Sequence, residues 1–427
     1  MKNLNTRNTL VRLFAIFLSI CVTTLFAQTV PVFSGRFGGG IYAYYPEAGD
    51  NTVEPSFRGL VSANHFLSES IHGTIDARIR RDVTGNVGRT RVYEAWLGWQ
   101  LQPDWEVQAG RLGSRGFGGI GFLDGGRFIY SLKKNLELSI YGGNEPDLNT
   151  FGFGTDVSKY GLATEGHTPD NHLMWGVSLL EQRYQGVLDR RMLTQNISLM
   201  PTPRSYIYQT AELDFAYREN GKDKSGLRVS DFHINSSEAA GSQWRFQESV
   251  GFRRGFKMLR SMRDIADTLF ESDPVYDGSV GANWRLIPQI EFHTDIRYQR
   301  KQSTKEDGTS DGAGITANTN SIKPLYAFID TRYNNNLYYS GTLYSISFEK
   351  EIVSRLSPRI GYSTERNNYR NGFGGGSTKY NRDQYELSVW YWLSDWSAGI
   401  TGDFGRVNDQ TENRYMFDIG YRIPTHQ

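Results

Sequence analysis

The stretch that decides the fold starts at Ile71 and reads IHGTIDARIR as far as Arg80. Apolar or small residues alternate in it strictly with polar or charged ones. Period-two alternation is typical of a β-strand whose two faces have different surroundings. The pattern resumes after each turn, in residues 93–101, 105–109, 128–132 and 136–141. The stretch from Ser70 to Tyr141 therefore predicts an up-and-down meander of antiparallel strands.

Alternating segments continue on both sides of this stretch. Most are roughly ten residues long, which is the length of a tilted strand that crosses a membrane. The segments are 36–45, 57–66, 172–180, 206–217, 244–252, 290–298, 344–348, 360–362, 385–393 and 415–423.

The composition favours strands over helices. The 427 residues include 46 Gly, 25 Tyr, 24 Phe and 9 Trp but only 13 Pro. Aromatic residues together with abundant glycine suit strands and turns. After the first 27 residues no apolar run approaches the ~20 residues that a membrane helix needs. The absence of such a run does not exclude a membrane β-barrel. In a barrel the polar lumen-facing residues alternate with the apolar lipid-facing ones, so the mean hydropathy of each segment is low.

Residues 1–27 are typical of a secretory signal peptide. Lys2, Arg7 and Arg12 form a basic region before an apolar run that ends at Ala27. The only cysteine, Cys21, lies in that run, so the mature chain has no disulfide and no thiol chemistry. The sequence thus predicts a signal peptide at 1–27 and a single barrel domain at 28–427.

The charge balance argues against a nucleic-acid partner. The chain has 47 basic and 46 acidic residues, and removal of the three basic residues of the signal leaves 44 against 46. A nucleic-acid-binding protein needs a basic excess.

Connections between the segments tend to alternate between short and long. Short turns at one end and long loops at the other are typical of outer-membrane barrels. Segment 325–333 does not fit this order, and we interpret it as a partial strand or a loop hairpin. The fold class predicted is an all-β transmembrane antiparallel up-and-down barrel of about 18 strands, within 16 to 20. The long loops expected are 46–55, 113–125, 143–160, 255–277, 301–323 and 367–383.

The polar face of these strands is too charged for a dry core. A secreted β-sandwich with a solvated outer face remains an alternative, but its core would bury many tyrosine hydroxyl groups that need partners. We expect the polar face to line a lumen and to form the path of solutes or ions. Its charged residues are Asp76, Arg78, Arg80, Glu94, Glu212, Asp214, Arg245, Arg253, Glu291, Asp295, Arg297, Arg359, Glu365, Asp418 and Arg422.

Two loop motifs have simpler interpretations than ligand binding. Residues 116–121 match G-x-G-x-x-G, but Gly125 and Gly126 follow where the motif needs a helix, so a long hairpin loop is favoured. Residues 307–312 have the spacing of a calcium loop, but Thr309 occupies a ligand position, so a solvated loop is favoured.

Two further segments were weighed as functional elements. His233 beside Ser236 and Ser237 invites comparison with a His–Ser hydrolase, although spacing cannot establish a nucleophile and its base. Residues 259–270 have helical apolar spacing and predict a short loop helix at an outer mouth. We expect no catalytic residues, no cofactor and no metal site, and the protein is not expected to be an enzyme.

Over nearly its whole mature length the chain resembles bacterial outer-membrane porins. The runs Tyr93–Gly98, Gln108–Arg111 and Asp124–Phe128 resemble the strand–turn–strand block of porins of the alginate-export type. That resemblance implies a monomeric barrel of about eighteen strands whose lumen arginines bind anionic substrates. Arg78, Arg80, Arg111 and Arg127 are the candidates here. The C-terminal residues Pro424–Gln427 depart from the aromatic ending of the family.

The function expected is a porin-like outer-membrane channel for passive diffusion of small hydrophilic, in particular anionic, solutes. The alternative is a non-conducting outer-membrane barrel that acts as an adhesin or receptor through its long extracellular loops. The partners expected are outer-membrane lipid and lipopolysaccharide, small solutes, and the barrel-assembly machinery during biogenesis. The sequence leaves open the solute and the choice between monomer and trimer.

Overall fold

The computed structural model describes residues 32–47, 49–65, 68–85, 87–113, 121–147, 152–219, 222–254, 274–302, 307–319, 325–335, 339–369 and 378–424. The predicted signal peptide, the predicted helix at 259–270 and residues 116–120 of the glycine-rich loop lie outside these ranges. Across the ranges described, no helix is long and apolar enough to cross a membrane.

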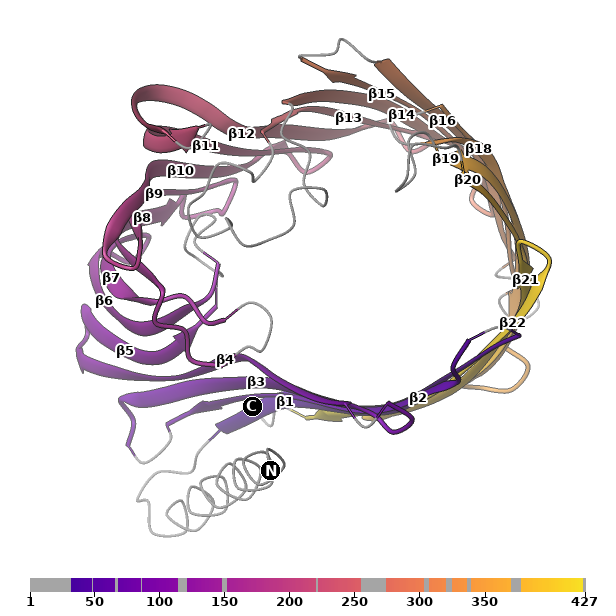
Figure 1. The fold of residues 1–427 in the computed structure, drawn as a ribbon, viewed down its shortest axis with the longest axis horizontal. Coiled ribbons are helices and arrows are strands. Elements are labelled where there is room, and N and C mark those ends of the chain that lie inside the picture. The colour runs from indigo at the N-terminus through magenta and orange to yellow at the C-terminus, as the bar shows by residue number, and fades with distance from the viewer. Residues whose placement is uncertain are drawn as a thin grey trace.

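The described residues form one closed antiparallel β-barrel. Each strand pairs with the next along the chain, and the first strand pairs with the last, so that the sheet has no free edge (Figure 1). Closure of this kind satisfies every ladder hydrogen bond. The predicted all-β up-and-down barrel is therefore confirmed. The strands are β1 (Val32–Pro46), β2 (Thr52–Asn64), β3 (Ile71–Asp82), β4 (Val87–Gln102), β5 (Trp105–Leu112), β6 (Leu123–Lys133), β7 (Leu136–Asn144), β8 (Val157–His167), β9 (Leu173–Tyr184), β10 (Val187–Thr202), β11 (Ser205–Glu219), β12 (Lys222–Ala240), β13 (Trp244–Arg253), β14 (Val275–Ile287), β15 (Ile290–Lys301), β16 (Asp307–Thr319), β17 (Leu325–Asn335), β18 (Tyr339–Lys350), β19 (Leu356–Tyr369), β20 (Thr378–Leu393), β21 (Trp396–Val407) and β22 (Gln410–Ile423).

The barrel has 22 strands, so the expected number of about 18, within 16 to 20, was wrong. Two of the missed strands are β16, expected to be part of the loop 301–323, and β17, expected to be partial. β16 reads DGTSDGAGITANT and shows little apolar alternation, because its outward positions include Asp307, Thr309 and Asp311 and its inward positions are mostly glycine, serine and threonine. The calcium-like spacing at 307–312 lies in this strand, so its interpretation as a loop was also wrong.

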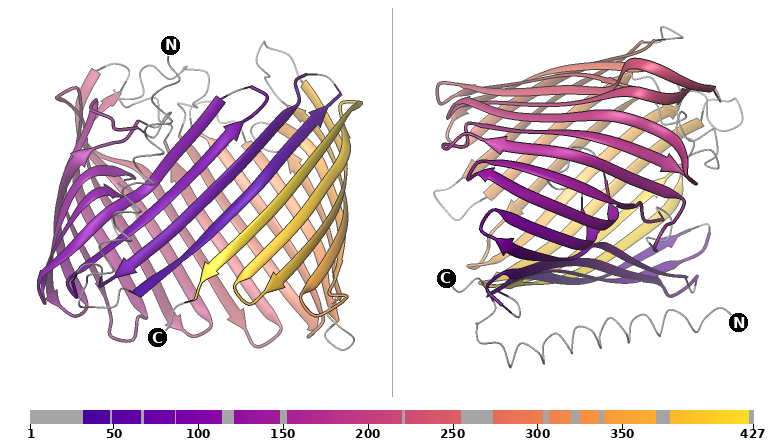
Figure 2. Two further views of the ribbon diagram at one scale, coloured as in Figure 1. Left: turned by 90° about the horizontal axis from the view of Figure 1, so that it is seen from below. Right: turned by 90° about the vertical axis from the view of Figure 1, so that its left-hand side faces the viewer.

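The two ends of the barrel differ as predicted. The longest connections, 113–122, 145–156, 254–274 and 370–377, all follow odd-numbered strands and so lie at one end, here called the loop end. Connections after even-numbered strands are short, as in 103–104, 134–135 and 288–289, and lie at the opposite end. Counting β16 and β17 as full strands removes the irregularity that the sequence showed. Figure 2 shows the tilted strands that join the two ends.

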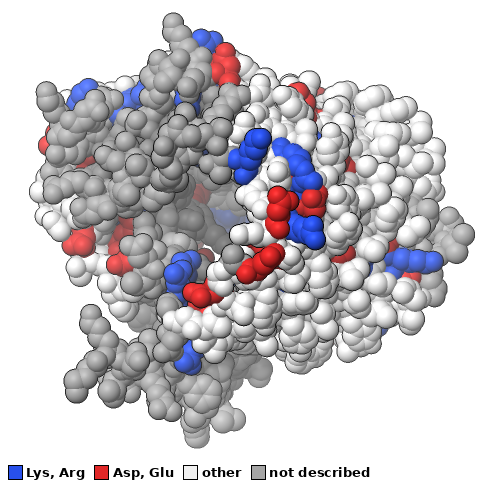
Figure 3. Space-filling view, turned by 45° about the vertical axis from the view of Figure 1, so that its right-hand side comes forward, with Lys and Arg blue, Asp and Glu red and all other residues white. Residues whose placement is uncertain are grey.

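The two faces of the sheet differ in polarity. Apolar side chains at alternate positions are exposed on the outward face; Ile140, Val280 and Ile400, for example, are each about 60% exposed, at 59%, 61% and 61%. In Figure 3 most of the described outer surface carries no charge, and Lys, Arg, Asp and Glu side chains gather beside a hollow. A soluble protein would bury such a surface, whereas a membrane barrel exposes it to lipid.

The inward face is not uniform around the barrel. Along β5–β12, here called the crowded wall, inward side chains are packed and buried. Leu112, Leu123, Tyr141, Ala163, Leu180 and Met192 form an apolar cluster there. Along β13–β22, here called the open wall, the buried polar residues are small and uncharged, namely Ser310, Asn334, Ser357, Asn367 and Ser388. Figure 1 shows the crowded wall at the left and the open wall at the upper right.

Candidate functional site

The inward face gathers the charged residues selected from the sequence. The strand registers place all fifteen of them on the face opposite the exposed apolar one. For example, Ile75 is exposed on the outward face. The next residue, Asp76, therefore points inward, together with its register partner Leu60. The strict alternation of these strands is what made the face readable from sequence.

Within the ranges that the structure describes, nine of these fifteen residues have an ion-pair or hydrogen-bond partner, and seven of the nine have it on a neighbouring strand. Asp76 accepts from Arg58 at 2.7 Å, and Arg80 pairs with Glu54. Across the open wall the carboxylate–arginine distances are 3.0 to 3.4 Å, and Asn367 donates to Glu365. These open-wall pairs are Glu291–Arg285, Asp295–Arg332, Arg297–Asp277 and Arg359–Glu386.

Six of the fifteen selected residues have no such partner within the described residues. Four are arginines and two are carboxylates that form neither an ion pair nor a side-chain hydrogen bond there. Because cations outnumber anions in this unpaired set, the field that it adds to the lumen favours anions. The set consists of Arg78, Arg245, Arg253, Arg422, Glu94 and Asp418.

Asp214 is the centre of the crowded wall. Only 1% of its side chain is exposed, and it accepts hydrogen bonds from Arg190, Arg228 and Ser230. Arg190 also reaches Glu212 at 2.9 Å, and the Arg228 guanidinium lies 3.4 Å from the centroid of the Tyr217 ring. A buried carboxylate between two arginines is held by charge-assisted hydrogen bonds in a region of low dielectric constant.

Sequence reasoning missed Arg190 and Arg228. Both belong to strands whose alternation is broken by β-bulges, at Leu188/Arg190 in β10 and opposite Asp214/Ala216 in β12. A bulge inserts one residue and so moves all later side chains to the other face in a simple period-two count. The signal that could have found them is the charge of the run Leu188-Asp189-Arg190-Arg191 itself.

Arg111 and Arg127, the two further arginines predicted to contact anions, are both buried and paired. Arg111 makes two hydrogen bonds to Asp124, at 2.6 and 2.7 Å, and donates to the carbonyls of Val92 and Gly152. Arg127 donates to Ser139 at 3.2 Å and lies 3.6 Å from Glu165. These contacts hold the crowded wall together and occupy donors that an anion would need.

Part of the long connection between β7 and β8 packs against this wall. Lys159, which is buried, pairs with Glu145 of the connection at 3.0 Å. The Arg111 guanidinium lies 5.7 Å from the ring centroid of Phe153. Residues of an outer loop therefore reduce the space available on this side of the barrel.

On the open wall, side chains reach across an intervening glycine. His293 of β15 bonds Asp330 of β17 at 2.8 Å, and Gly314 of β16 lies between them in the register. His72 reaches Glu106 at 2.9 Å in the same way over Gly98, at the edge of the crowded wall. A Cβ atom at Gly314 would collide with the His293 ring and with the Ile329 carbonyl. The small residues of β16 therefore leave the space in which side chains of β15 and β17 can reach each other.

The proposed His–Ser comparison finds no geometric support among the described atoms. His233 lies 3.4 Å from Asp231 on the inward face, whereas Ser236 donates to Glu248 on the outward face. The described residues also contain no group of three or more His, Cys, Asp or Glu side chains that could hold a metal ion.

At the loop end, one carboxylate ties the first strand to the last. The Glu47 side chain accepts the Thr411 backbone N–H at 2.7 Å, and the Glu47 N–H donates to the Thr411 carbonyl at 2.7 Å. The backbone and side-chain hydrogen bonds from Thr411 lower the pKa of Glu47 below its ordinary value. Glu47 therefore helps to close the barrel beside the β1–β22 seam.

Comparisons with known proteins support the fold. No family model matches the chain, and no curated protein matches it in sequence. A mutant of the ferric enterobactin receptor PfeA of Pseudomonas aeruginosa is similar over 91% of this chain and 80% of its own, with 9% identity and a TM-score of 0.54. The siderophore receptor PirA of the same organism has 12% identity, the same coverages and a TM-score of 0.50.

OpdQ of the same organism aligns over 93% of this chain and all of its own, with 9% identity and a TM-score of 0.47. At identities of 9% and 12%, the similarity to the two receptors shows a shared large β-barrel fold. The chemistry of this chain has to be argued from its own residues.

Proposed function

We propose that this protein is an outer-membrane channel through which small hydrophilic solutes, preferentially anions, diffuse passively. The observation that carries the proposal is a closed barrel of 22 strands with an apolar outward face and a charged inward face. The diameter of a barrel grows with its strand number, and at this size wall side chains alone do not fill the lumen. The apolar face then meets lipid, and the lumen holds water.

The route to the membrane follows from the sequence. Residues 1–27 would direct export and be removed, and residues 28–427 would form the inserted barrel. Insertion would place the barrel in the bacterial outer membrane with the help of the barrel-assembly machinery.

The inward charges support a weak rather than a strong preference of the channel for anions over cations. Most carboxylates and arginines pair with each other, so their fields largely cancel at the centre of the lumen. Among the fifteen selected residues, four arginines but only two carboxylates have no partner in the described part of the chain; the arginines are Arg78, Arg245, Arg253 and Arg422. An arginine can bind a carboxylate or phosphate in two-point geometry, so these four are the proposed contacts for anionic solutes.

A second function has its own support. The crowded wall and the packed β7–β8 connection fill part of the lumen, and barrels of 22 strands include transporters whose lumen is plugged. A non-conducting adhesin or receptor that acts through the connections at the loop end would use the same fold.

Conductance separates the two functions. The refolded mature chain is placed in a planar bilayer, and single-channel currents and reversal potentials are recorded in a salt gradient. We expect stepwise conductance and a modest preference for anions. A protein that is β-rich by circular dichroism and heat-modifiable on gels, but passes no current, would contradict the channel and support the receptor.

A further inference from the structure

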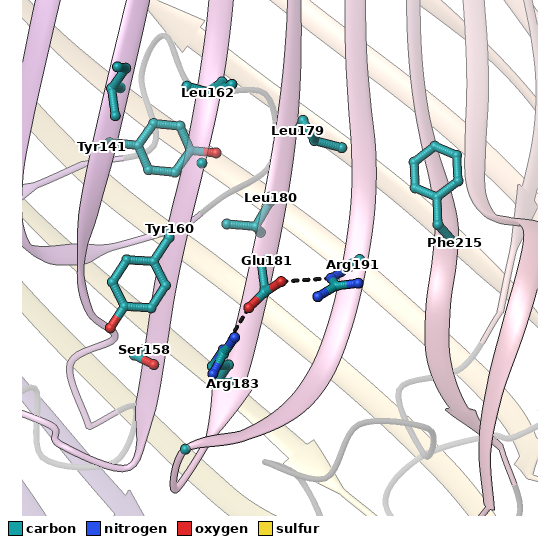
Figure 4. Close-up of a pocket in the computed structure, with 13 residues that line it drawn as sticks. Tyr141, Ser158, Tyr160, Leu162, Leu179, Leu180, Glu181, Arg183, Arg191 and Phe215 are labelled. Carbon is teal, nitrogen blue, oxygen red and sulfur yellow. Dashed lines mark hydrogen bonds and ion pairs between the residues drawn. The ribbon is translucent and has the colours of Figure 1, made fainter.

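The crowded wall has a groove on its outward face near the loop end. The groove has a volume of about 1090 Å³. Ile140, Leu162 and Leu179 give it an apolar lining, and Tyr160 and Phe215 stand at its sides (Figure 4). Glu181, Arg183 and Arg191 lie at its end next to the β9–β10 turn.

The groove coincides with a bend in the barrel wall. The register shifts between Leu188 and Arg190 and between Arg191 and Met192, and again in the next pair of strands at Asp214/Ala216. Bulges bend a strand and increase its twist. Successive bulges in β10, β11 and β12 thus hollow the outer surface of a wall that is otherwise a smooth ladder.

Its charged end is an arginine pair arranged around one carboxylate. The two Glu181 oxygens each accept one Nε–H, from Arg183 at 2.6 Å and from Arg191 at 2.6 Å (Figure 4). The terminal Nη groups of both arginines have no partner among the described residues. The arginine side chains are 45% and 52% exposed. The trio carries one net positive charge and presents two oriented guanidinium forks outward.

Another outward ion pair at the loop end differs from this trio. Arg366 bonds both carboxylate oxygens of Asp383 at 2.7 Å, and its other terminal nitrogen donates to two backbone carbonyls. That pair is neutral and its donors are used. A second outward groove, of about 720 Å³, has Phe348, Ile360 and Leu387 in its lining, and the charged residues in that lining are Glu349, Lys350 and Arg359. The groove beside Glu181 combines an apolar lining with two guanidinium groups that are oriented by one carboxylate.

We propose that this groove binds a phosphorylated lipid of the leaflet at the loop end, with an acyl chain along Ile140, Leu162 and Leu179 and a phosphate between Arg183 and Arg191. The proposal rests on the proposed function, because it requires the barrel to span a membrane. The apolar lining lies at the level of acyl chains, and the arginine pair lies toward the rim where headgroups begin. Tyr160 has the amphipathic ring that favours this boundary.

The test measures lipid adducts on the whole mature chain. The detergent-solubilised protein is titrated with diphosphorylated lipid A, and separately with the same lipid after removal of its phosphates, and adducts are counted by native mass spectrometry. We expect Arg183→Gln/Arg191→Gln to weaken the phosphorylated adduct by about tenfold or more, because two charge-assisted contacts are lost. Arg366→Gln, which removes the same kind of charge from the rim, is the matched control and should leave the adduct unchanged.

The exposed positions of the two arginines favour retention of the fold, which heat-modifiable mobility verifies, and Arg191→Gln alone is a second variant. Equal adducts for the double variant and the control, or equal binding of the dephosphorylated lipid, would overturn the proposal. Conductance of the same samples keeps the two hypotheses apart. A conducting channel without phosphate-dependent adducts refutes only the lipid site, whereas adducts on a non-conducting barrel refute only the channel.

Discussion

The crowded wall and the open wall belong to the same hydrogen-bonded sheet, but their inward side chains are packed in different ways. On the crowded wall, β5–β12, an apolar cluster and buried ions such as Arg127, Lys159 and Asp214 fill the inward side. On the open wall, β13–β22, the ion pairs remain partly exposed, and the small residues of β16 leave space for them. The difference teaches that one barrel can combine a packed core on one side with a solvated surface on the other.

The largest expected effect comes from the buried carboxylate of the crowded wall. Asp214→Ala leaves Arg190 and Arg228 buried, with 12% and 10% of their side chains exposed. Removal of one partner from a buried ion network costs about 3–5 kcal/mol. The free energy of unfolding from lipid vesicles in urea measures this.

The matched change on the open wall is Asp295→Ala. Asp295 is 33% exposed and its partner Arg332 is 41% exposed. An ion pair in contact with water contributes about 0–1 kcal/mol. Equal losses for the two variants would show that the crowded wall is as solvated as the open wall, and the comparison would fail.

An intermediate effect is expected where the open wall depends on a missing side chain. Gly314→Ala would push the His293 ring away from Asp330 and press on the Ile329 carbonyl. Overpacking of this kind costs about 1–3 kcal/mol. Urea unfolding in the same vesicles measures the loss.

Gly278→Ala in β14 is the control for this change. The nearest atom to an added Cβ there is the Ser249 carbonyl oxygen at 3.6 Å, which is an ordinary contact. We expect its effect to stay within about 1 kcal/mol of zero. If both alanine variants lose the same free energy of unfolding, the His293–Asp330 pair does not depend on the missing side chain at Gly314.

The smallest effect concerns pH at the seam between the two ends of the chain. The Glu47 pKa is lowered in the folded protein by the hydrogen bonds from Thr411. Its contribution is therefore fully present above the ordinary glutamate pKa of 4.5 and is lost as the pH falls through the lower folded value. The protection factor of the Thr411 amide, which is its intrinsic exchange rate divided by the observed rate at each pH, should be constant from neutral pH downward and fall only in that acidic window. Glu47→Gln should remove the pH dependence, and an unchanged profile in this variant would contradict the role of the carboxylate.

The inward face was predictable where the alternation is regular. Ile290–Tyr298 is the clearest case, because every second residue except Thr294 is apolar or aromatic and the residues between them are all ionisable. The strand prediction failed where side chains of adjacent strands determine which residues a strand can carry. β16 carries small residues because His293 and Asp295 extend over it, and a sequence pattern of one strand does not contain the side chains of the next.

The sequence by itself determined the class of the fold, since a period-two pattern repeated over nearly the whole chain can only be satisfied by paired strands with one apolar and one polar face. It also determined which of the regular residues face inward. Only the tertiary structure decided the strand number, the partner of each arginine and the division into two walls. Bulges in β10, β11 and β12 shift the register by one residue, and a single shift reverses every later side chain. Such a shift is set by contacts between strands, so it can be read only when the strands are seen together.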